Sequence, residues 1–204
     1  METKVLDKSQ FQEITELIRD SQVVAFPTDT VYGLGIRYDS EVAVKRLKEA
    51  KQRDANKPFP LMVSNIAQID QVAYLDSAYS EVVKHLMPGA LTIIVKKKTV
   101  IPDYATNGKN TIAIRMPDDK FVLELLEELG PLLVTSANMS GEKAANDENE
   151  VLQQLDGRIA AVVKGHSLSS IPSTIVDLTD KQIKILRQGE ITLGKIEPYL
   201  KEKS

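Results

Sequence analysis

A short apolar run that stops at a proline and opens into a polar, glycine-flanked loop constrains the fold of this chain more than any other feature. Residues 23–26 (VVAF) are typical of a buried strand, and Pro27 cannot donate to a neighbouring strand. The loop 28–35 (TDTVYGLG) combines hydroxyl, carboxylate and phenol groups with two glycines that allow close backbone approach. Open α/β sheets bind ligands at such strand ends. An ordinary connection with solvated threonines fits the spacing equally well.

Helical and strand-like patterns alternate along the rest of the chain. A capping-box pattern at Ser9 and Gln12 predicts the start of one helix, and Ser40 and Asp118 are predicted N-caps. We predict helices near residues 9–18, 40–50, 77–86, 118–129, 150–155 and 191–200. We predict strands at residues 22–26, 35–37, 61–63, 91–95, 111–115, 132–134, 159–163, 173–178 and 183–187. This order, with no linker or repeat, predicts a single α/β domain over residues 1–204 with a mixed sheet.

Composition excludes several classes of protein. The chain has 204 residues, no cysteine and two histidines, which removes thiolate chemistry and makes a histidine-rich metal site an unfavourable interpretation. No apolar run approaches the ~20 residues of a membrane span, and residues 1–21 lack a signal-peptide core. We therefore expect a cytoplasmic protein that does not contact membranes. The net charge of −3 argues against a generally basic, nucleic-acid-binding surface.

Common catalytic motifs are also missing from the sequence. It contains no phosphate-binding loop of the GxxxxGK[ST] type, no GxGxxG fingerprint and no GxSxG nucleophile elbow. His85 falls on a predicted helix and His166 in a loop, each far from the other, so both are interpreted as structural or surface residues. A nucleotide site in this chain would have to be of an uncommon type.

Polar clusters nevertheless recur where predicted strands or helices end. Arginine offers paired donors to phosphate or carboxylate, lysine offers a point charge, and hydroxyl and amide groups suit a small polar substrate. Together these side chains favour a multiply anionic ligand. The clusters are residues 28–30, Lys51 with Arg53 and Lys57, Arg115, residues 135–138, and residues 173–174 with Arg187.

Each cluster also has a purely structural interpretation. The basic group around Lys51 and Arg53 fits a solvated helix end, where cations oppose the helix dipole. Ser136 and Asn138 are common turn residues, and Ser173 could be a hydroxyl at a strand edge. Arg115 is harder to explain in this way, because it closes an apolar strand and a cation there needs a partner.

The clusters and their neighbours form an ordered set of motifs that resembles the YrdC/YciO family over residues 23–190. The motifs are PTDTVYGLG (27–35), KxR (51–53), PGALT (88–92), TIAIRMP (111–117), TSANMSG (135–141), STIVD (173–177) and LRxG (186–189). The resemblance implies a twisted, open α/β sheet around a large, positively charged cavity. It also implies threonylcarbamoyl-AMP synthase activity, which joins L-threonine, bicarbonate and ATP and releases pyrophosphate for threonylcarbamoyladenosine modification of tRNA.

The resemblance implies a threonine site and an ATP site. Thr30, Val134 and Ser173 are expected to contact L-threonine, Arg115 to pair with its carboxylate, and Ser64 to lie near a position that touches it. Lys51 and Arg53 are expected to hold ATP phosphates and, with Arg115, to be the catalytic groups. The residues expected at ATP are Lys51, Arg53, Thr111, Ser136, Asn138 and Arg187.

The implied chemistry needs no protein nucleophile, because the carboxylate of N-carboxy-threonine attacks ATP. Fixed cations would stabilise the charge on the α-phosphate and on the departing pyrophosphate. We expect Mg²⁺ to enter with ATP, since no carboxylate cluster suited to an all-protein Mg²⁺ site is evident. tRNA or tRNA-modification proteins are the partners that the resemblance implies.

Two departures from the family keep alternatives open. Many relatives have proline after KxR, where this chain has Asp54, as in the YciO-like branch. Some relatives also carry a second C-terminal domain, which we do not expect in a chain that ends at Ser204. One alternative is an RNA-binding or YciO-like protein of the same fold. Another is a carbamoyl- or acyl-adenylate enzyme that uses a different small substrate.

Overall fold

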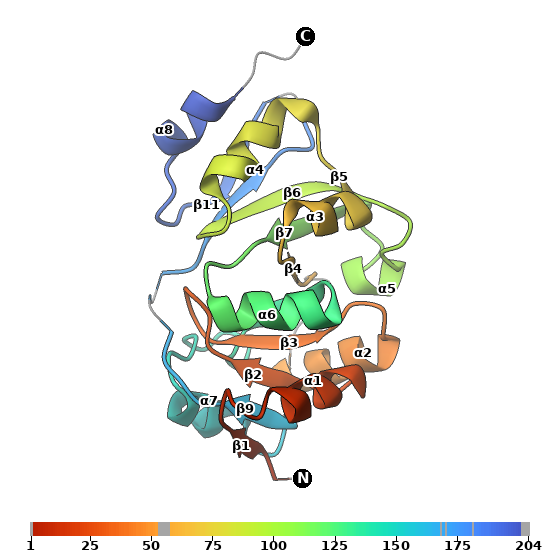
Figure 1. Cartoon of the computed structure of the whole chain (residues 1–204), viewed down its shortest axis with the longest axis vertical. Helices are drawn as coiled ribbons and strands as arrows, with labels where there is room; N and C mark the ends of the chain where they lie inside the picture. The colour runs from red at the N-terminus through yellow and green to blue at the C-terminus, as the bar shows by residue number, and fades with distance from the viewer. Residues whose placement is uncertain (1, 53–57, 168, 170, 181, 201–204) are drawn as a thin grey trace.

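One continuous mixed sheet forms the centre of the molecule in a computed structural model, which describes residues 2–52, 58–167, 169, 171–180 and 182–200. Its strand order is β1-β9-β2-β3-β8-β4-β7-β6-β10-β11, and β5 pairs with β6 beside this path. β1 and β11 are the two ends, so the sheet is open. Figure 1 shows β1 and α8 at opposite ends of the long axis. The prediction of an open, mixed α/β fold is confirmed.

The strands are short, and parallel and antiparallel pairs are mixed. Pairs β1/β9, β2/β9, β4/β7 and β6/β10 are parallel, whereas β3, β5 and β11 pair antiparallel with their neighbours. The strands are β1 (Lys4–Leu6), β2 (Val24–Phe26), β3 (Gly33–Arg37), β4 (Leu61–Met62), β5 (Ala73–Tyr74), β6 (Leu91–Lys97), β7 (Thr111–Arg115), β8 (Leu132–Ser136), β9 (Ala161–Val163), β10 (Thr174–Asp177) and β11 (Lys184–Arg187).

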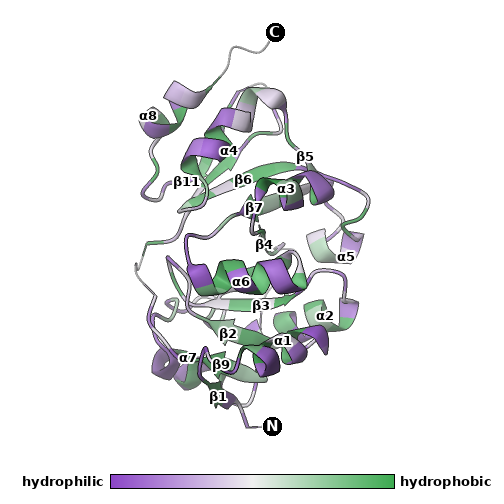
Figure 2. Cartoon of the chain, in the orientation of Figure 1, coloured by the Kyte–Doolittle hydropathy of each residue, from purple (hydrophilic) through white to green (hydrophobic). Residues whose placement is uncertain are grey.

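Helices cover the sheet, and the buried apolar side chains form two clusters. The helices are α1 (Phe11–Arg19), α2 (Glu41–Lys51), α3 (Ile66–Val72), α4 (Ser80–Leu86), α5 (Asp103–Thr106), α6 (Lys120–Leu129), α7 (Glu148–Leu155) and α8 (Leu193–Ile196), with 3₁₀ turns η1 (Ser77–Tyr79) and η2 (Glu197–Tyr199). Apolar residues of α1 and α6 belong to one cluster, and those of α2, α3, α4 and α7 to the other. Figure 2 shows hydrophobic colour on the strands and polar colour on the outer turns of these helices.

Strand β2 is apolar at every position because both of its faces are buried. Ala25 packs in the cluster that contains α2, whereas Val24 and Phe26 pack in the cluster that contains α1 and α6. All three are fully buried. A strand covered on both faces has no solvent side and loses the alternation of polar and apolar residues.

No helix in the described part of the chain is long and apolar enough to cross a bilayer.

Several predicted helix boundaries are wrong by a few residues. Helix α1 begins after Gln10, whose side chain makes no cap, and the expected box at Ser9 and Gln12 does not form. Instead, Asp7 donates its backbone N–H to Gln10 Oε1 (2.9 Å) and accepts from Ser9 N–H (2.9 Å). Two pairs of polar residues here have the spacing of a capping box, residues 7 and 10 and residues 9 and 12. The spacing alone therefore does not show which pair forms hydrogen bonds.

Other corrections concern caps and short elements. Asp119, not Asp118, caps α6 by accepting from Val122 N–H (3.0 Å). The predicted helix 191–200 is only α8 followed by η2. Strands β1 and β5 and helices α3 and α5 were not predicted, because elements of two to seven residues carry too few repeats for a periodic signal.

Candidate functional site

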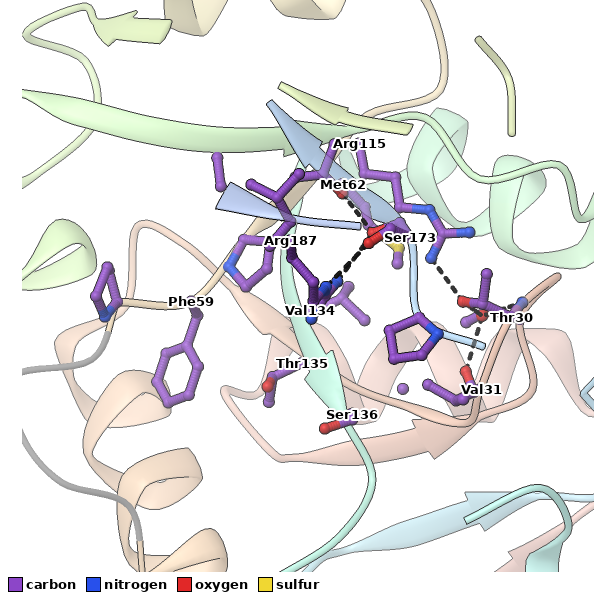
Figure 3. A pocket seen from close by; sticks show the side chains of 18 of the residues that line it. Thr30, Val31, Phe59, Met62, Arg115, Val134, Thr135, Ser136, Ser173 and Arg187 are labelled. Carbon is purple, nitrogen blue, oxygen red and sulfur yellow. Dashed lines mark hydrogen bonds between the residues drawn. The ribbon is translucent and has the colours of Figure 1, made fainter. Parts of the chain in front are cut away.

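A cavity of about 550 Å³ opens between the loop after β2 and strands β6, β7, β8, β10 and β11. Figure 3 shows polar side chains from these elements pointing toward one another across it, with Phe59 at one side. The lining combines hydroxyl groups and cations with apolar side chains such as Ile94 and Val134. Such a mixed lining is typical of a small-molecule site.

Sheet register brings distant residues into one row across the floor of this cavity. Arg187 of β11 lies opposite Ile175, Ile175 lies beside Thr92, and Thr92 lies opposite Arg115. Met62 of β4 continues the row beside Arg115. All five line the cavity. With strands about 4.8 Å apart, the two arginines are separated by three spacings, roughly 14 Å between Cα atoms.

Arg115 is the most constrained cation of the site. Its Nη2 donates to both carboxylate oxygens of Asp29 at 2.8 Å, and the side chains are 7% and 9% exposed. Its Nη1 donates to Thr30 Oγ1 (2.7 Å) and its Nε to the Gly89 carbonyl (3.2 Å). Burial lowers the pKa of the guanidinium, and the Asp29 charge opposes that shift. Asp29 is thus the partner that a cation at the end of an apolar strand requires.

The loop after β2 holds Thr30 through its own hydroxyl network. Thr28 Oγ1 accepts from Thr30 N–H (3.1 Å) and donates to the Val31 carbonyl (2.8 Å). Tyr32, which is fully buried, directs its hydroxyl at the Val163 and Gly165 carbonyls at 2.8 and 2.9 Å. These bonds fix the loop against the end of β9.

Gly33 leaves the space that β8 needs beside this loop. A Cβ atom built on Gly33 would lie 2.6 Å from Val134 Cγ1. The side chain of Val134 lines the cavity. The expectation that the glycines allow close approach is therefore confirmed, and what approaches is the protein's own side chain.

Ser173 and Arg187 form the other end of the row. Arg187 Nε donates to the Ser173 carbonyl (2.9 Å) and Nη2 to its hydroxyl (3.2 Å), and the hydroxyls of Ser173 and Thr92 are 2.7 Å apart. Arg187 is exposed at the rim, and no carboxylate in the described ranges lies within ion-pair distance of it. Partial burial and the nearby charge of Arg115 lower the pKa of Arg187.

Lys51 lies behind the cavity rather than in solvent. It is 1% exposed, and its ammonium donates to the carbonyls of Ser136 and Asn138 and, at 3.3 Å, to Asn138 Oδ1. The Ser136 hydroxyl donates to the same Asn138 oxygen. The interpretation of Lys51 as a solvated helix end is therefore wrong. Arg53, Asp54 and Lys57 lie outside the described residues.

Most of the predicted site residues meet at one cavity, and two described ones do not line it. Those that line it are Thr30, Thr111, Arg115, Val134, Ser136, Asn138, Ser173 and Arg187. Lys51 does not line it, but its ammonium binds two residues that do, through the Ser136 and Asn138 carbonyls and the Asn138 side-chain oxygen. Ser64 lies away from the lining, where its N–H donates to Gln68 Oε1 (2.9 Å) and its hydroxyl accepts from Asn65 (3.0 Å).

Sequence reasoning missed several residues of the cavity. Thr92, Lys109 and Glu142 line it, and Asp29 holds its buried arginine. Asp29 stands inside the predicted loop, so the need of Arg115 for a partner could have identified it. Thr92 becomes visible only once the register of β6 against β7 is known. Among the described residues, no three His, Cys, Asp or Glu side chains are grouped so as to hold a metal ion.

Comparisons with known proteins relate the chain to a set of synthases and to YciO. The profile of the family Sua5_yciO_yrdC, described as "Telomere recombination", matches residues 16–189. The chain is 40% identical over 198 residues to a threonylcarbamoyl-AMP synthase of Bacillus subtilis, covering 94% of this chain and 56% of that protein. It is 36% identical over 188 residues to the synthase of Pyrococcus abyssi, covering 91% and 55%. The chain thus spans about half the length of these curated relatives.

Solved structures agree with the sequence comparisons. The structure of P. abyssi Sua5 complexed with L-threonine superposes with a TM-score of 0.90 and 32% identity, covering 97% of this chain and 61% of that one. Escherichia coli YciO superposes with a TM-score of 0.85 and 26% identity, covering 95% and 97%.

Proposed function

The chain belongs to the Sua5/YciO/YrdC family, and from this premise we propose that it is an L-threonylcarbamoyladenylate synthase. In this reaction ATP, L-threonine and bicarbonate give threonylcarbamoyl-AMP, pyrophosphate and water, so the enzyme is a nucleotidyltransferase. The observation that carries the proposal is the row across the cavity floor in which Thr92 and Ile175 separate Arg115 from Arg187. Two cations there suit a ligand that carries several negative charges.

The amino acid binds at the Arg115 end of the row. Arg115 and Thr30 are joined by a 2.7 Å hydrogen bond, so a carboxylate at this point would meet a guanidinium and a hydroxyl in fixed positions. Val134 and the Ser173 hydroxyl border the same space, which suits a short side chain with a hydroxyl group. That P. abyssi Sua5 was solved with L-threonine supports this choice of amino acid.

ATP binds beside the amino acid, between the segment 136–138 and Arg187. Ser136, Asn138 and Thr111 offer hydroxyl and amide groups to phosphate oxygens. Lys51 holds the carbonyls of Ser136 and Asn138 and thereby keeps their side chains at the cavity. By resemblance, Arg53 completes the phosphate site.

The chemical step is an attack by the carboxylate of N-carboxy-threonine on the α-phosphorus of ATP. One oxygen–phosphorus bond forms, the bond to the bridging oxygen of the β-phosphate breaks, and the electron pair leaves with pyrophosphate. The side chains orient the two reactants and stabilise negative charge, and none forms a covalent intermediate. If ATP carries Mg²⁺ into the site, the ion would neutralise part of the phosphate charge.

The product belongs to tRNA modification in the cytoplasm. Threonylcarbamoyl-AMP is a mixed anhydride with a reactive carbonyl, so a tRNA-modification partner that receives it directly limits its hydrolysis. We place tRNA or such a partner protein downstream of this chain.

A pyrophosphate-release assay tests the proposal. The protein is incubated with ATP, L-threonine and bicarbonate, with each omitted in turn, and the B. subtilis synthase is run in parallel. Pyrophosphate release that requires all three substrates is expected. No threonine-dependent release, with the relative active under the same conditions, would reject the synthase function.

A YciO-like role on another ligand is the second candidate. It is favoured by the match to E. coli YciO, which extends over 97% of that chain, and by Asp54 after the KxR motif. If another amino acid gives faster pyrophosphate release than threonine, that amino acid is the substrate, and the enzyme still forms an adenylate. Steeply salt-dependent RNA binding without any pyrophosphate release would favour the RNA-binding alternative.

A further inference from the structure

The floor of the cavity continues along β7 well beyond the row of arginines. Side chains two residues apart share one face of a strand, and Arg115, Ala113, Thr111 and Lys109 all line the cavity. Lys109 lies two residues before the strand begins and six residues before Arg115. At about 3.3 Å per residue, the Cα atoms of Lys109 and Arg115 lie roughly 20 Å apart.

The neighbouring strand β6 adds a second lysine to the same end. Leu91, Ile93 and Val95 face the core, whereas Thr92 and Ile94 line the cavity. Lys96 is the next residue on the cavity side, and it lies directly opposite Thr111. Lys109 lines the cavity, whereas Lys96 is exposed and does not line it. The two lysines lie beside Thr111, at the end of the cavity opposite to Arg115.

Lys96 and Lys109 differ from the other lysines near them. Lys97 points to the opposite face and donates to Asp103 (2.9 Å) and the Ile101 carbonyl (2.7 Å). Lys98 donates to the Asp70 carbonyl and lies over the Tyr74 ring. Lys96 and Lys109 are exposed, and no carboxylate in the described ranges forms an ion pair with either.

The backbone that carries Lys109 is held firmly. Its carbonyl accepts from Thr106 Oγ1 (2.8 Å), and its N–H donates to the Thr106 carbonyl (3.2 Å). Asn107 before it accepts from Lys48 Nζ (2.7 Å), which ties the turn to α2. A cation mounted on an ordered turn loses less conformational freedom on binding than one on a mobile loop.

We propose that Lys96 and Lys109 form a second cationic site, the lysine end, which binds the terminal phosphates of a nucleoside triphosphate and the pyrophosphate that leaves. This inference rests on the proposed function and adds to it the direction of the triphosphate, which extends along β7 away from Arg115. An amino acid held by Arg115 is too short to reach the lysine end. A polyphosphate that extends from the amino acid along β7 is long enough to reach it. Glu142 also lines the cavity, and one carboxylate does not offset the lysines and the unpaired Arg187.

The test compares ligands that share a nucleoside and differ in phosphate number. Lys96→Gln, Lys109→Gln and the double variant are prepared. Lys120→Gln is the matched control, because Lys120 is an exposed lysine of α6, and no residue of that helix lines the cavity. Calorimetry then measures the affinity for ATP, AMP, pyrophosphate and L-threonine at two salt concentrations. Unchanged circular dichroism and melting temperature establish that the variants are folded.

The expected result is a selective loss. Each single variant weakens ATP and pyrophosphate binding by roughly threefold and the double variant by about tenfold, less at high salt, as for partly exposed charge pairs. AMP and threonine affinities stay within about twofold of the unsubstituted chain. Equal effects on ATP and AMP, no effect on ATP, or the same effect in Lys120→Gln would each overturn the lysine end. If the unsubstituted chain binds neither ATP nor pyrophosphate, the proposed function itself fails.

Discussion

Asp29 and Arg115 form a buried ion pair in which a single guanidinium nitrogen, Nη2, lies 2.8 Å from both carboxylate oxygens. This arrangement neutralises the arginine on one side and leaves Nη1 to hold Thr30 beside the cavity. Asp29 is not a lining residue. It therefore acts as a counter-ion and positioning residue for Arg115, and it keeps a desolvated cation stable without occupying the space of the ligand.

Replacing Asp29 by Asn should destabilise the fold more than any exposed ion-pair deletion. The amide leaves Arg115 charged and buried without its counter-ion, and such a loss costs about 3 kcal/mol or more. Chemical denaturation measures it. Asp39→Asn is the matched control, because Asp39 pairs with Arg37 at 2.8 Å with both side chains partly exposed, and it should cost less than about 1 kcal/mol. Similar losses in the two variants would contradict the role assigned to Asp29.

Arg115→Ala should remove threonine binding more than ATP binding. A charged hydrogen bond contributes about 1.5–3 kcal/mol, so the threonine KM should rise by roughly 10-fold or more, while ATP affinity changes by less than about threefold. Arg115→Lys keeps the charge for Asp29 but lacks the second nitrogen that holds Thr30, so it should fold normally and bind threonine weakly. Parallel loss of both substrates in the lysine variant would show that Arg115 supports the whole cavity rather than the amino acid.

Much of the cavity could be predicted from the sequence because its polar residues lie at, or a few residues after, the ends of short apolar strands. Thr30, Arg115 and Ser136 are such residues, and each was found. What could not be predicted depends on register. Arg187 reaches Arg115 only through the pairing of β11, β10, β6 and β7. Pairings of residues 12 to 83 positions apart are not contained in any local pattern.

Charge alone also does not tell whether a lysine is buried or exposed. The run Lys96 to Lys98 reads as one basic strand end, yet the structure gives its three members three different environments. The same pattern predicts Lys51 as a solvated cation at a helix end, yet its side chain is buried. Ser64, which the resemblance implies near the threonine site, does not line the cavity, and it forms hydrogen bonds with Gln68 and Asn65.

The Tyr32 hydroxyl should contribute to stability in a pH-dependent way. Burial raises the pKa of this phenol, and the charges of Glu148 and Asp147 add to the rise. As pH increases past the ordinary value of about 10, the unfolded chain ionises first, so the stabilisation is complete below pH ~10 and is lost above it. Tyr32→Phe should cost about 1–2 kcal/mol at pH 7, and the difference from the unsubstituted chain should shrink above pH 10.

Two comparisons make this measurement specific to Tyr32. Tyr79→Phe is the control, because Tyr79 is also buried and donates to a carbonyl, that of Asp180, at 3.2 Å on the other side of the molecule. Because Tyr32 ties the loop of Thr30 to β9, only Tyr32→Phe should also raise the threonine KM. An unchanged KM together with lower stability would limit Tyr32 to a structural role.

Gly33→Ala should destabilise the chain through Val134, and a second substitution should reverse the effect. The added methyl group would lie 2.6 Å from Val134 Cγ1, and forced overpacking of this kind costs about 1–3 kcal/mol. Val134→Ala removes the clashing atom, so the double variant should be more stable than the sum of the two single losses predicts. Gly194→Ala in α8 is the control, since its nearest neighbour would be 4.0 Å away, and it should be neutral or stabilising. If the double variant is simply additive, the clash with Val134 is not the reason that position 33 is glycine.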